Sequence, residues 1–217
     1  MNNLSPYRAM LEKERSVNLE IAVKNCSEIL FHQGNLRPTI SQICQMSTSL
    51  SRRTICRYFE KSATPAIEHI ILQGLQLAGD TTADAWFNYI FKDGIHAVDR
   101  LANMPTNVMR FEDADRINPL WIIIQLGSIY PRQIRTESNR IVSRMGSKFA
   151  DLLHQLDNQS IPADAIETLG LALMSTTVTL STLSKQSTDP HQYFLALTNL
   201  NHLLGLAIKS QHLEARF

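Results

Sequence analysis

The stretch TISQICQMSTSLSRRTICRYF, residues 39–59, predicts the local structure that decides the fold. Thr39 precedes a segment with helical apolar spacing, and Gln42 follows three residues later, which is the spacing of a capping box at a helix N-terminus. The first helix is therefore expected to begin at Ile40 and to end near Met46.

A second short helix is expected after the polar run Ser47–Ser49, which breaks the apolar pattern. This helix begins near Ser51, and Ile55 lies on its inner face. Upstream, residues 19–30 place apolar side chains at helical spacing, and this segment ends before Gly34. Three short helices so close together in sequence are expected to form one compact unit.

Helical periodicity continues through the rest of the 217 residues, and no segment shows the polar and apolar alternation of a strand. The expected fold class is therefore all-α. Pro65 after Thr64 is placed like the first residue of a longer helix that runs toward Gly79. Residues 109–116 show no clear period and are expected to form a loop. Further helices are expected at residues 82–91, 95–104, 118–129, 132–156, 162–184 and 190–209.

The last two expected helices, residues 162–184 and 190–209, carry apolar residues around most of their circumference. A helix of this kind is buried on every side, so we expect both to pack against a second copy of the chain. The alternative is that they are central helices of a monomer. We expect no membrane span, because polar residues interrupt both segments. Small residues that permit close helix approach are Gly170, Ala172, Gly205 and Ala207.

Basic residues are concentrated near the N-terminus, although the net charge of the chain is only +1. Residues 1–61 contain nine Lys or Arg against five Asp or Glu. Within residues 37–61 the basic side chains are Arg37, Arg52, Arg53, Arg57 and Lys61, against the single acid Glu60. Such a local excess is typical of a surface that binds a polyanion. The alternative is a solvated face without a partner.

The sequence carries no signal for an enzyme, a metal site or export. It contains no GxSxG elbow, no HExxH pair and no phosphate-binding glycine loop. Cys26, Cys44 and Cys56 have no CxxC spacing, so neither a disulfide framework nor a zinc site is indicated. The first 16 residues are charged throughout, unlike a signal peptide. We therefore expect a cytoplasmic protein that is not an enzyme and needs no metal or cofactor.

Several positions in residues 19–59 match the pattern of one family of DNA-binding proteins. Ile43-Cys44 match its Ile-Ala pair, Leu50-Ser51 match its Val-Ser, and Thr54 matches its Thr. Tyr58-Phe59 match the Tyr/His-Phe that ends its second helix. With the upstream helix, this segment resembles the helix-turn-helix of the tetracycline-repressor (TetR) family of transcriptional regulators.

The segment departs from the family pattern at three places. Thr48-Ser49 stand in the turn where the family prefers Ala-Gly, and the turn is one residue longer. Cys56 occupies the usual aromatic position. Lys61 lies one residue before the family's usual lysine.

The resemblance implies a domain division and a function. Residues 1–62 would form a three-helix DNA-binding domain, with residues 1–15 as a flexible or helical arm. Residues 63–217 would form a helical bundle that dimerises and binds an effector. The protein would be a TetR-type regulator, a repressor that a small molecule releases from a pseudopalindromic operator. The alternative is a helical homodimeric protein-interaction module that has lost operator binding.

A recognition helix places its N-terminal residues against base edges, where Arg pairs with guanine and Thr meets a thymine methyl group. The expected contacts to double-stranded DNA are Ser51, Arg52, Arg53 and Thr54 at bases, and Thr39, Arg57, Tyr58 and Lys61 at phosphates. The resemblance also implies an effector pocket among the C-terminal helices. Candidate lining residues, which could equally be core residues, are Trp86, Tyr89, Met109, Phe111, Trp121, Gln125 and Tyr130.

Overall fold

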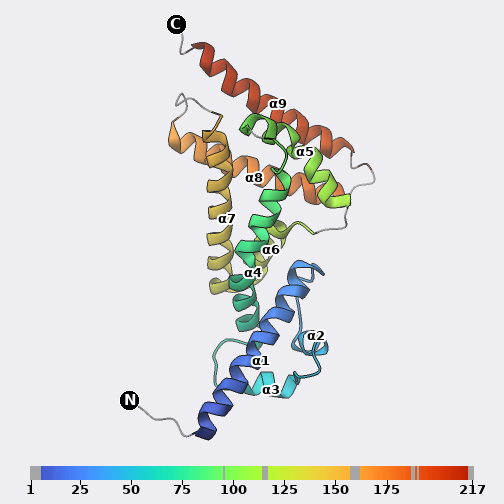
Figure 1. The fold of residues 1–217 in the computed structure, drawn as a ribbon, viewed down its shortest axis with the longest axis vertical. Coiled ribbons are helices and arrows are strands. Elements are labelled where there is room, and N and C mark those ends of the chain that lie inside the picture. Colours follow the sequence, from blue (N-terminus) through green and yellow to red (C-terminus); the bar gives the residue numbers. More distant parts are fainter. Residues whose placement is uncertain are drawn as a thin grey trace. The chain divides into compact units, whose positions relative to one another are not determined.

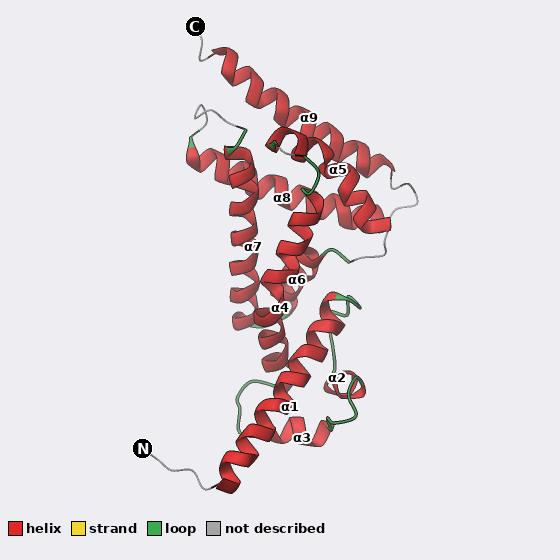
Figure 2. Cartoon of the chain, in the orientation of Figure 1, coloured by secondary structure: helices red, strands yellow, loops and turns green. Residues whose placement is uncertain are grey.

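The computed structural model describes residues 6–94, 96–113, 117–156, 162–186, 189 and 191–214. In these ranges the chain forms nine helices and no strand, so the all-α prediction is confirmed (Figure 2). The helices are α1 (Pro6–Phe31), α2 (Ile40–Gln45), α3 (Arg52–Tyr58), α4 (Ala66–Ile90), α5 (Ala97–Asp113), α6 (Pro119–Ile129), α7 (Arg132–His154), α8 (Ala163–Gln186) and α9 (His191–Glu214).

The chain divides into two compact units, each assembled from two separate segments of sequence. Unit 1 comprises Met1–Asp80 and Gln125–Ser138, and unit 2 comprises Thr81–Ile124 and Asn139–Phe217. The predicted domain boundary after residue 62 lies inside unit 1. Unit 1 therefore contains the long helix α1 and the short helices α2 and α3 together with helical residues from much later in the chain.

In unit 1, α1, α2 and α3 pack against one another around a small core (Figure 1). Ile43 of α2 and Ile55 of α3 are completely buried. The predicted α1 stripe is confirmed, and its buried members are Ala22, Val23, Cys26, Ile29 and Leu30. The predicted starts of α2 and α3 are confirmed as well. The arm expected at residues 1–15 is helical from Pro6 onward.

Hydrogen bonds between distant residues connect the segments of unit 1. The hydroxyl of Tyr130, which follows α6, donates to the carbonyl of Leu36 at 3.0 Å across 94 positions of sequence. Burial raises the pKa of the Tyr130 phenol, so the hydroxyl keeps its hydrogen at neutral pH. The Tyr130 hydrogen bond therefore connects the segment Gln125–Ser138 to the loop that precedes α2. The Ser27 hydroxyl of α1 donates to the carbonyl of Gly74 in α4 at 3.2 Å, which connects these two helices.

α4 is one helix where the sequence predicted two. The expected break at Gly79 does not occur, and the helix continues to Ile90. Glycine costs about 1 kcal/mol in helix propensity relative to alanine. However, Ala83, Trp86 and Ile90 continue the buried stripe at helical spacing, so burial of this face outweighs that cost.

α5 contradicts the loop predicted at residues 109–116, because the helix continues to Asp113. Residues 114–116 lie outside the described part of the chain. The predicted end at Met104 is also wrong, although Pro105 stands inside α5 and proline costs about 3 kcal/mol in a helix interior. One continuous buried stripe stabilises the helix across it: Ala97, Leu101, Met104, Val108 and Phe111.

The core of unit 2 contains an aromatic cluster from α4 and α7. The Phe149 ring lies 5.3 Å from the rings of Phe87 and Phe91, centroid to centroid, in edge-on geometry. Trp86 lies 6.3 Å from Phe149. Phe149 is completely buried and belongs to the apolar stripe predicted for α7. Edge-on aromatic pairs contribute about 0.5–1.5 kcal/mol beyond their buried area, so this cluster anchors α7 on α4.

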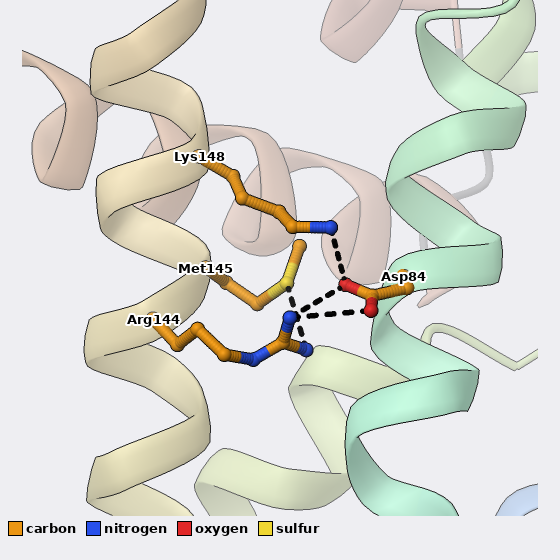
Figure 3. A network of polar contacts seen from close by, with 4 residues as sticks. All are labelled: Asp84, Arg144, Met145 and Lys148. Carbon is orange, nitrogen blue, oxygen red and sulfur yellow. Dashed lines mark hydrogen bonds and ion pairs between the residues drawn. The ribbon is translucent and has the colours of Figure 1, made fainter.

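A polar network connects the same two helices (Figure 3). The Asp84 carboxylate of α4 accepts a hydrogen bond from Lys148 Nζ at 2.6 Å and lies 2.9 Å from Arg144 Nη1, both on α7. Burial alone would raise the pKa of Asp84, but hydrogen bonds and charges from Lys148 and Arg144 outweigh burial and lower it. Asp84 is therefore ionised at neutral pH and bridges two cations.

α8 approaches α7 very closely at Gly170. A Cβ atom at this position would lie 2.5 Å from the Ala150 backbone nitrogen and 2.7 Å from its Cα. Gly170 therefore permits close approach, as predicted. Ala172, predicted to do the same, is exposed in the single chain. The side chains of Gly205 and Ala207 lie outside the described residues.

In unit 2, α9 packs against α8 and α5. Several leucines of α8 and α9 are exposed in the single chain, so their burial against a second copy stays a prediction. The exposed leucines are Leu169, Leu171 and Leu183 on α8, and Leu195 and Leu203 on α9. α8 also carries buried polar side chains, which are Thr177, Ser181 and Ser184. The Thr177 hydroxyl donates a hydrogen bond to the Leu173 carbonyl at 2.7 Å.

Among the described residues, one helical segment, Asp164–Lys185, is long and apolar enough to cross a bilayer by length and composition. Its mean hydropathy is 1.2, and 39% of its most apolar window is buried. Core helices of proteins outside membranes have the same properties, so this segment is weak evidence for a span.

Candidate nucleic-acid interface

The predicted capping box fixes the N-terminus of α2. Thr39 Oγ1 accepts the Gln42 backbone N–H at 3.2 Å, and Gln42 Oε1 accepts the Thr39 backbone N–H at 2.9 Å. The Thr39 hydroxyl also lies 3.0 Å from Gln42 Oε1, to which it donates. Thr39 is exposed but acts here as a helix cap, so its phosphate contact stays a prediction.

Serine hydroxyls close the turn that leads into α3. Ser47 Oγ and Ser49 Oγ lie 2.8 Å apart, and the Leu50 N–H donates to the Ser47 carbonyl at 3.4 Å. Ser51 then caps α3, because its side chain accepts the Thr54 N–H at 3.1 Å. The Ser51 and Thr54 hydroxyls are also hydrogen-bonded at 2.8 Å. Two residues predicted to reach bases therefore also determine where α3 begins.

The two faces of α3 differ sharply in burial and charge. Ile55 is completely buried on the inner face. Arg52, Arg53 and Arg57 are all exposed, and the helix contains no acidic residue. The outer face of α3 therefore presents three positive charges to solvent.

The end of α3 is held by α1. The Arg15 guanidinium donates to the Tyr58 carbonyl at 2.9 Å and lies over the Tyr58 ring, 5.4 Å from its centroid. Asn18 Nδ2 donates to the Tyr58 hydroxyl at 3.0 Å. Tyr58 is half-buried, and its phenol is fixed between these two groups.

The chain after α3 is anchored on the first turns of α4. The Phe59 ring stacks on His69 with centroids 5.1 Å apart, and Ser62 Oγ is hydrogen-bonded to His69 Nε2 at 2.9 Å. Lys61 lies between these anchored residues and is exposed. The structure therefore places a fourth exposed cation directly after α3.

The seven residues predicted to line an effector pocket are divided between the two units. Trp86, Tyr89, Met109, Phe111 and Trp121 belong to unit 2, whereas Gln125 and Tyr130 belong to unit 1. Tyr89 packs edge-on against Phe111 at 5.3 Å, and both Trp86 and Phe111 are buried. Tyr130 binds the Leu36 carbonyl, as described above. The effector contacts stay predictions.

The buried polar atoms of unit 2 without a hydrogen-bond partner among the described residues include Trp86 Nε1 and Asn107 Oδ1. Their side chains are 1% and 0% exposed. Asn107 is fixed by its other amide atom, because Nδ2 donates to the Ile90 carbonyl at 3.2 Å. A buried donor and a buried acceptor are thus left for a further polar group.

Unit 1 contains a small open cavity that the sequence did not predict. Its volume is about 190 Å³, below the range of about 300–1,000 Å³ that drug-sized ligands occupy. The lining residues are Ala63, Thr64, Pro65, Glu68, Pro131, Arg132, Gln133 and Ile134. None of the predicted effector residues is among them.

The cysteines and acidic residues give no sign of metal chemistry in the described residues, where no group of three or more potential ligands occurs. Cys26 is buried in the α1 stripe, and burial raises its pKa to about 12. Cys44 is half-buried, and its pKa is raised by burial and by the neighbouring Cys56, which is exposed. Cys26 therefore contributes to packing.

Arg15 and Asn18 belong to the candidate interface, although the sequence alone did not single them out. They lie 43 and 40 positions before Tyr58, and no local spacing rule connects α1 to the end of α3.

No protein-family model matches the chain, and no curated protein sequence matches it either.

Proposed function

We propose that this protein is a DNA-binding transcriptional regulator of the TetR type, with α2 and α3 as its helix-turn-helix. The observation that carries the proposal is the outer face of α3, where Arg52, Arg53 and Arg57 are exposed while Ile55 is buried. A capped helix with an apolar inner face and a cationic outer face is suited to the major groove. There, an arginine pair with guanine O6 and N7 contributes about 1–3 kcal/mol of discrimination.

The proposed mechanism is repression by occupancy of an operator in the cytoplasm. A homodimer holds two copies of α3 about one DNA turn apart, so that each enters the major groove of one half-site. A small-molecule effector favours a conformation in which both copies cannot bind at once, and the operator is released. DNA binding and effector binding therefore oppose each other through a shared equilibrium.

The exposed apolar residues of α8 and α9 support a second copy of this chain as the dimer partner. Leu183 on α8 is 39% exposed and Leu195 on α9 is 47% exposed. Homodimer interfaces are more apolar than the rest of a protein surface, so exposed leucines on two adjacent helices are suited to one. Two such helices from each protomer would form a four-helix contact.

The unpartnered polar atoms of unit 2 support an effector site near α4 and α5. Trp86 Nε1 is a donor and Asn107 Oδ1 an acceptor, and leaving such groups unsatisfied costs about 1–3 kcal/mol each. A polar group of an effector would satisfy whichever of these atoms it reached. The proposed effector is therefore a polar, hydrogen-bonding small molecule.

The test of DNA binding is selection from a pool of random duplexes by the purified full-length protein, followed by sequencing. We expect enrichment of a pseudopalindromic site for the wild-type protein and its loss in the Arg52→Ala/Arg53→Ala double variant. The matched control is Arg110→Ala/Arg140→Ala, which removes the same charge from exposed positions of unit 2. This control should enrich the same site as the wild type.

The opposite result would identify the other candidate function. If the wild-type protein is dimeric and enriches no sequence, the proposal fails, and the chain is better described as a helical interaction module. Equal loss of enrichment in both double variants would also count against it, because the effect would then follow from net charge alone.

A further inference from the structure

The structure brings a second group of residues to the end of α3. α1 and α3 pack against each other in unit 1 (Figure 1). Arg15 and Asn18 of α1 both contact Tyr58. Arg15 contacts the carbonyl and the ring of Tyr58, whereas Asn18 contacts its hydroxyl. This group, Arg15, Asn18 and Tyr58, is called the α1 clamp below.

The direction of the Asn18 hydrogen bond determines what the Tyr58 hydroxyl can still do. A phenol has one hydrogen to donate and can also accept. Because Asn18 Nδ2 donates to the oxygen, the hydrogen of Tyr58 is left for another acceptor. Tyr58 is half-buried, so part of its surface faces solvent.

Arg15 also retains donors. A guanidinium has five N–H groups, and the contact with the Tyr58 carbonyl uses a donor on Nη2. The Arg15 side chain is exposed, and its guanidinium lies over the Tyr58 ring. An acceptor beside this ring would therefore meet a positive charge together with a phenolic hydrogen.

The charge around the α1 clamp indicates what that acceptor is. Arg57 on the last turn of α3 and Lys61 just after it are both exposed cations, and Glu60 is the one acid between them. On α1, the exposed acids Glu12 and Glu14 and the exposed cation Lys13 precede Arg15. Arginine, lysine and tyrosine side chains are the usual donors to phosphate oxygens in protein–DNA complexes. An anionic oxygen is the acceptor to which each of these donors binds most strongly.

We propose that Arg15 and Tyr58 bind a phosphate of the DNA backbone beside the recognition helix, and that Asn18 is a positioning residue that leaves the Tyr58 hydrogen to this phosphate. The inference rests on the proposed DNA binding and extends the interface from α2 and α3 to α1. It assigns α1 a contact that carries affinity rather than sequence preference, because every site offers the same phosphates.

Arg15 is tested by the salt dependence of binding to the selected duplex. Arg15→Ala should weaken binding about tenfold, equally for selected and random duplexes, and lower the slope of log affinity against log salt by about one. Lys13→Ala is the matched control, because Lys13 is exposed on the same helix but lies about 200° around its axis. It should leave both quantities nearly unchanged.

Asn18 is tested through Tyr58. Asn18→Ala should weaken binding in the wild-type background and have no further effect in a Tyr58→Phe background. Asn18→Asp keeps a hydrogen bond to the phenol but reverses it, because a carboxylate only accepts. This variant should therefore bind DNA more weakly than Asn18→Ala while unfolding at a similar temperature. Because the added carboxylate also repels phosphate, the test is its cost in a Tyr58→Phe background, which keeps this charge but lacks the phenolic hydrogen: there Asn18→Asp should weaken binding less than in the wild type.

The outcomes separate this inference from the proposed function. If the wild-type protein binds no duplex, both fail. If the wild type binds and Arg52→Ala/Arg53→Ala loses its site preference, while Arg15→Ala keeps full affinity and the full salt slope, the α1 clamp proposal alone is overturned. Additive effects of Asn18→Ala and Tyr58→Phe would overturn the positioning role of Asn18.

Discussion

The Asp84 carboxylate shows how one residue can link stability to pH. It is 32% exposed and bridges Arg144 and Lys148, which together lower its pKa below 3.8. A carboxyl group with a lowered pKa in the folded state stabilises the fold above its unfolded pKa. That contribution is lost as the pH falls through the folded-state pKa.

Asp84→Asn should therefore destabilise the protein at pH 7 by about 1–2 kcal/mol, because two cations lose their shared partner and solvent screens part of the effect. The difference from wild type should shrink as the pH falls through the lowered folded-state pKa of Asp84, where the carboxylate itself becomes protonated. Urea unfolding at several pH values measures this. Asp151→Asn, at an exposed acid of α7, should have little effect, and an equal loss in both variants would contradict the role given to Asp84.

At the scale of elements, two glycines on packed helices have opposite tolerance for a methyl group. At Gly170 a Cβ would meet backbone atoms of Ala150 at 2.5 and 2.7 Å, so α7 or α8 would have to move. At Gly146 the nearest atom is Leu171 Cδ1 at 3.2 Å, the end of a flexible side chain. Alanine otherwise favours a helix over glycine by about 1 kcal/mol.

Gly170→Ala should consequently lower the free energy of unfolding by about 1–3 kcal/mol, as overpacking does. Gly146→Ala should be neutral or slightly stabilising. Thermal and urea unfolding of the two variants provide the comparison. Similar stability in both would mean that α7 and α8 separate without cost, contrary to the packing described.

The elements also show which parts of the fold local sequence can predict. α2 and α3 were predictable because each is capped by a side chain that binds a backbone N–H only three positions later. Thr39 accepts from Gln42 at the start of α2, and Ser51 accepts from Thr54 at the start of α3. Arg53 and Arg57 of α3 were also predictable, since helical spacing places them opposite Ile55. Arg52 lies only about 60° from Ile55 around the helix, and it is exposed because it stands at the first position of α3. The continuation of α5 past Pro105 was not, because the energy that outweighs the proline comes from tertiary burial.

The candidate site follows the same rule. Its α3 residues follow from local periodicity, whereas Arg15 and Asn18 enter through contacts that span about 40 residues and depend on how α1 packs. The effector residues were chosen by residue type alone. Residue type did not reveal that Tyr130 and Trp86 belong to different units, since that division depends on the whole fold.

At the scale of the whole molecule, the proposed homodimer depends on exposed leucines of α8 and α9. Leu183→Lys with Leu195→Lys places two charges on this surface, and we expect a monomer in sedimentation equilibrium and loss of cooperative binding to the selected palindrome. The control is Leu77→Lys with Val98→Lys. These two apolar side chains are 59% and 63% exposed and lie outside α8 and α9. That control should remain dimeric, and an unchanged dimer in the first variant would place the interface elsewhere.

The composite make-up of unit 1 bears on how the protein is made by the ribosome. Its first segment ends at Asp80, but the hydrogen bond from Tyr130 to Leu36 and the rest of Gln125–Ser138 come later. At about 5–20 residues per second, synthesis of the 58 residues Thr81–Ser138 takes roughly 3 to 12 s. During this interval α1, α2 and α3 emerge without the segment that ties their loop. A nascent chain stalled before Gln125 should therefore be far more sensitive to protease than one stalled well after Ser138.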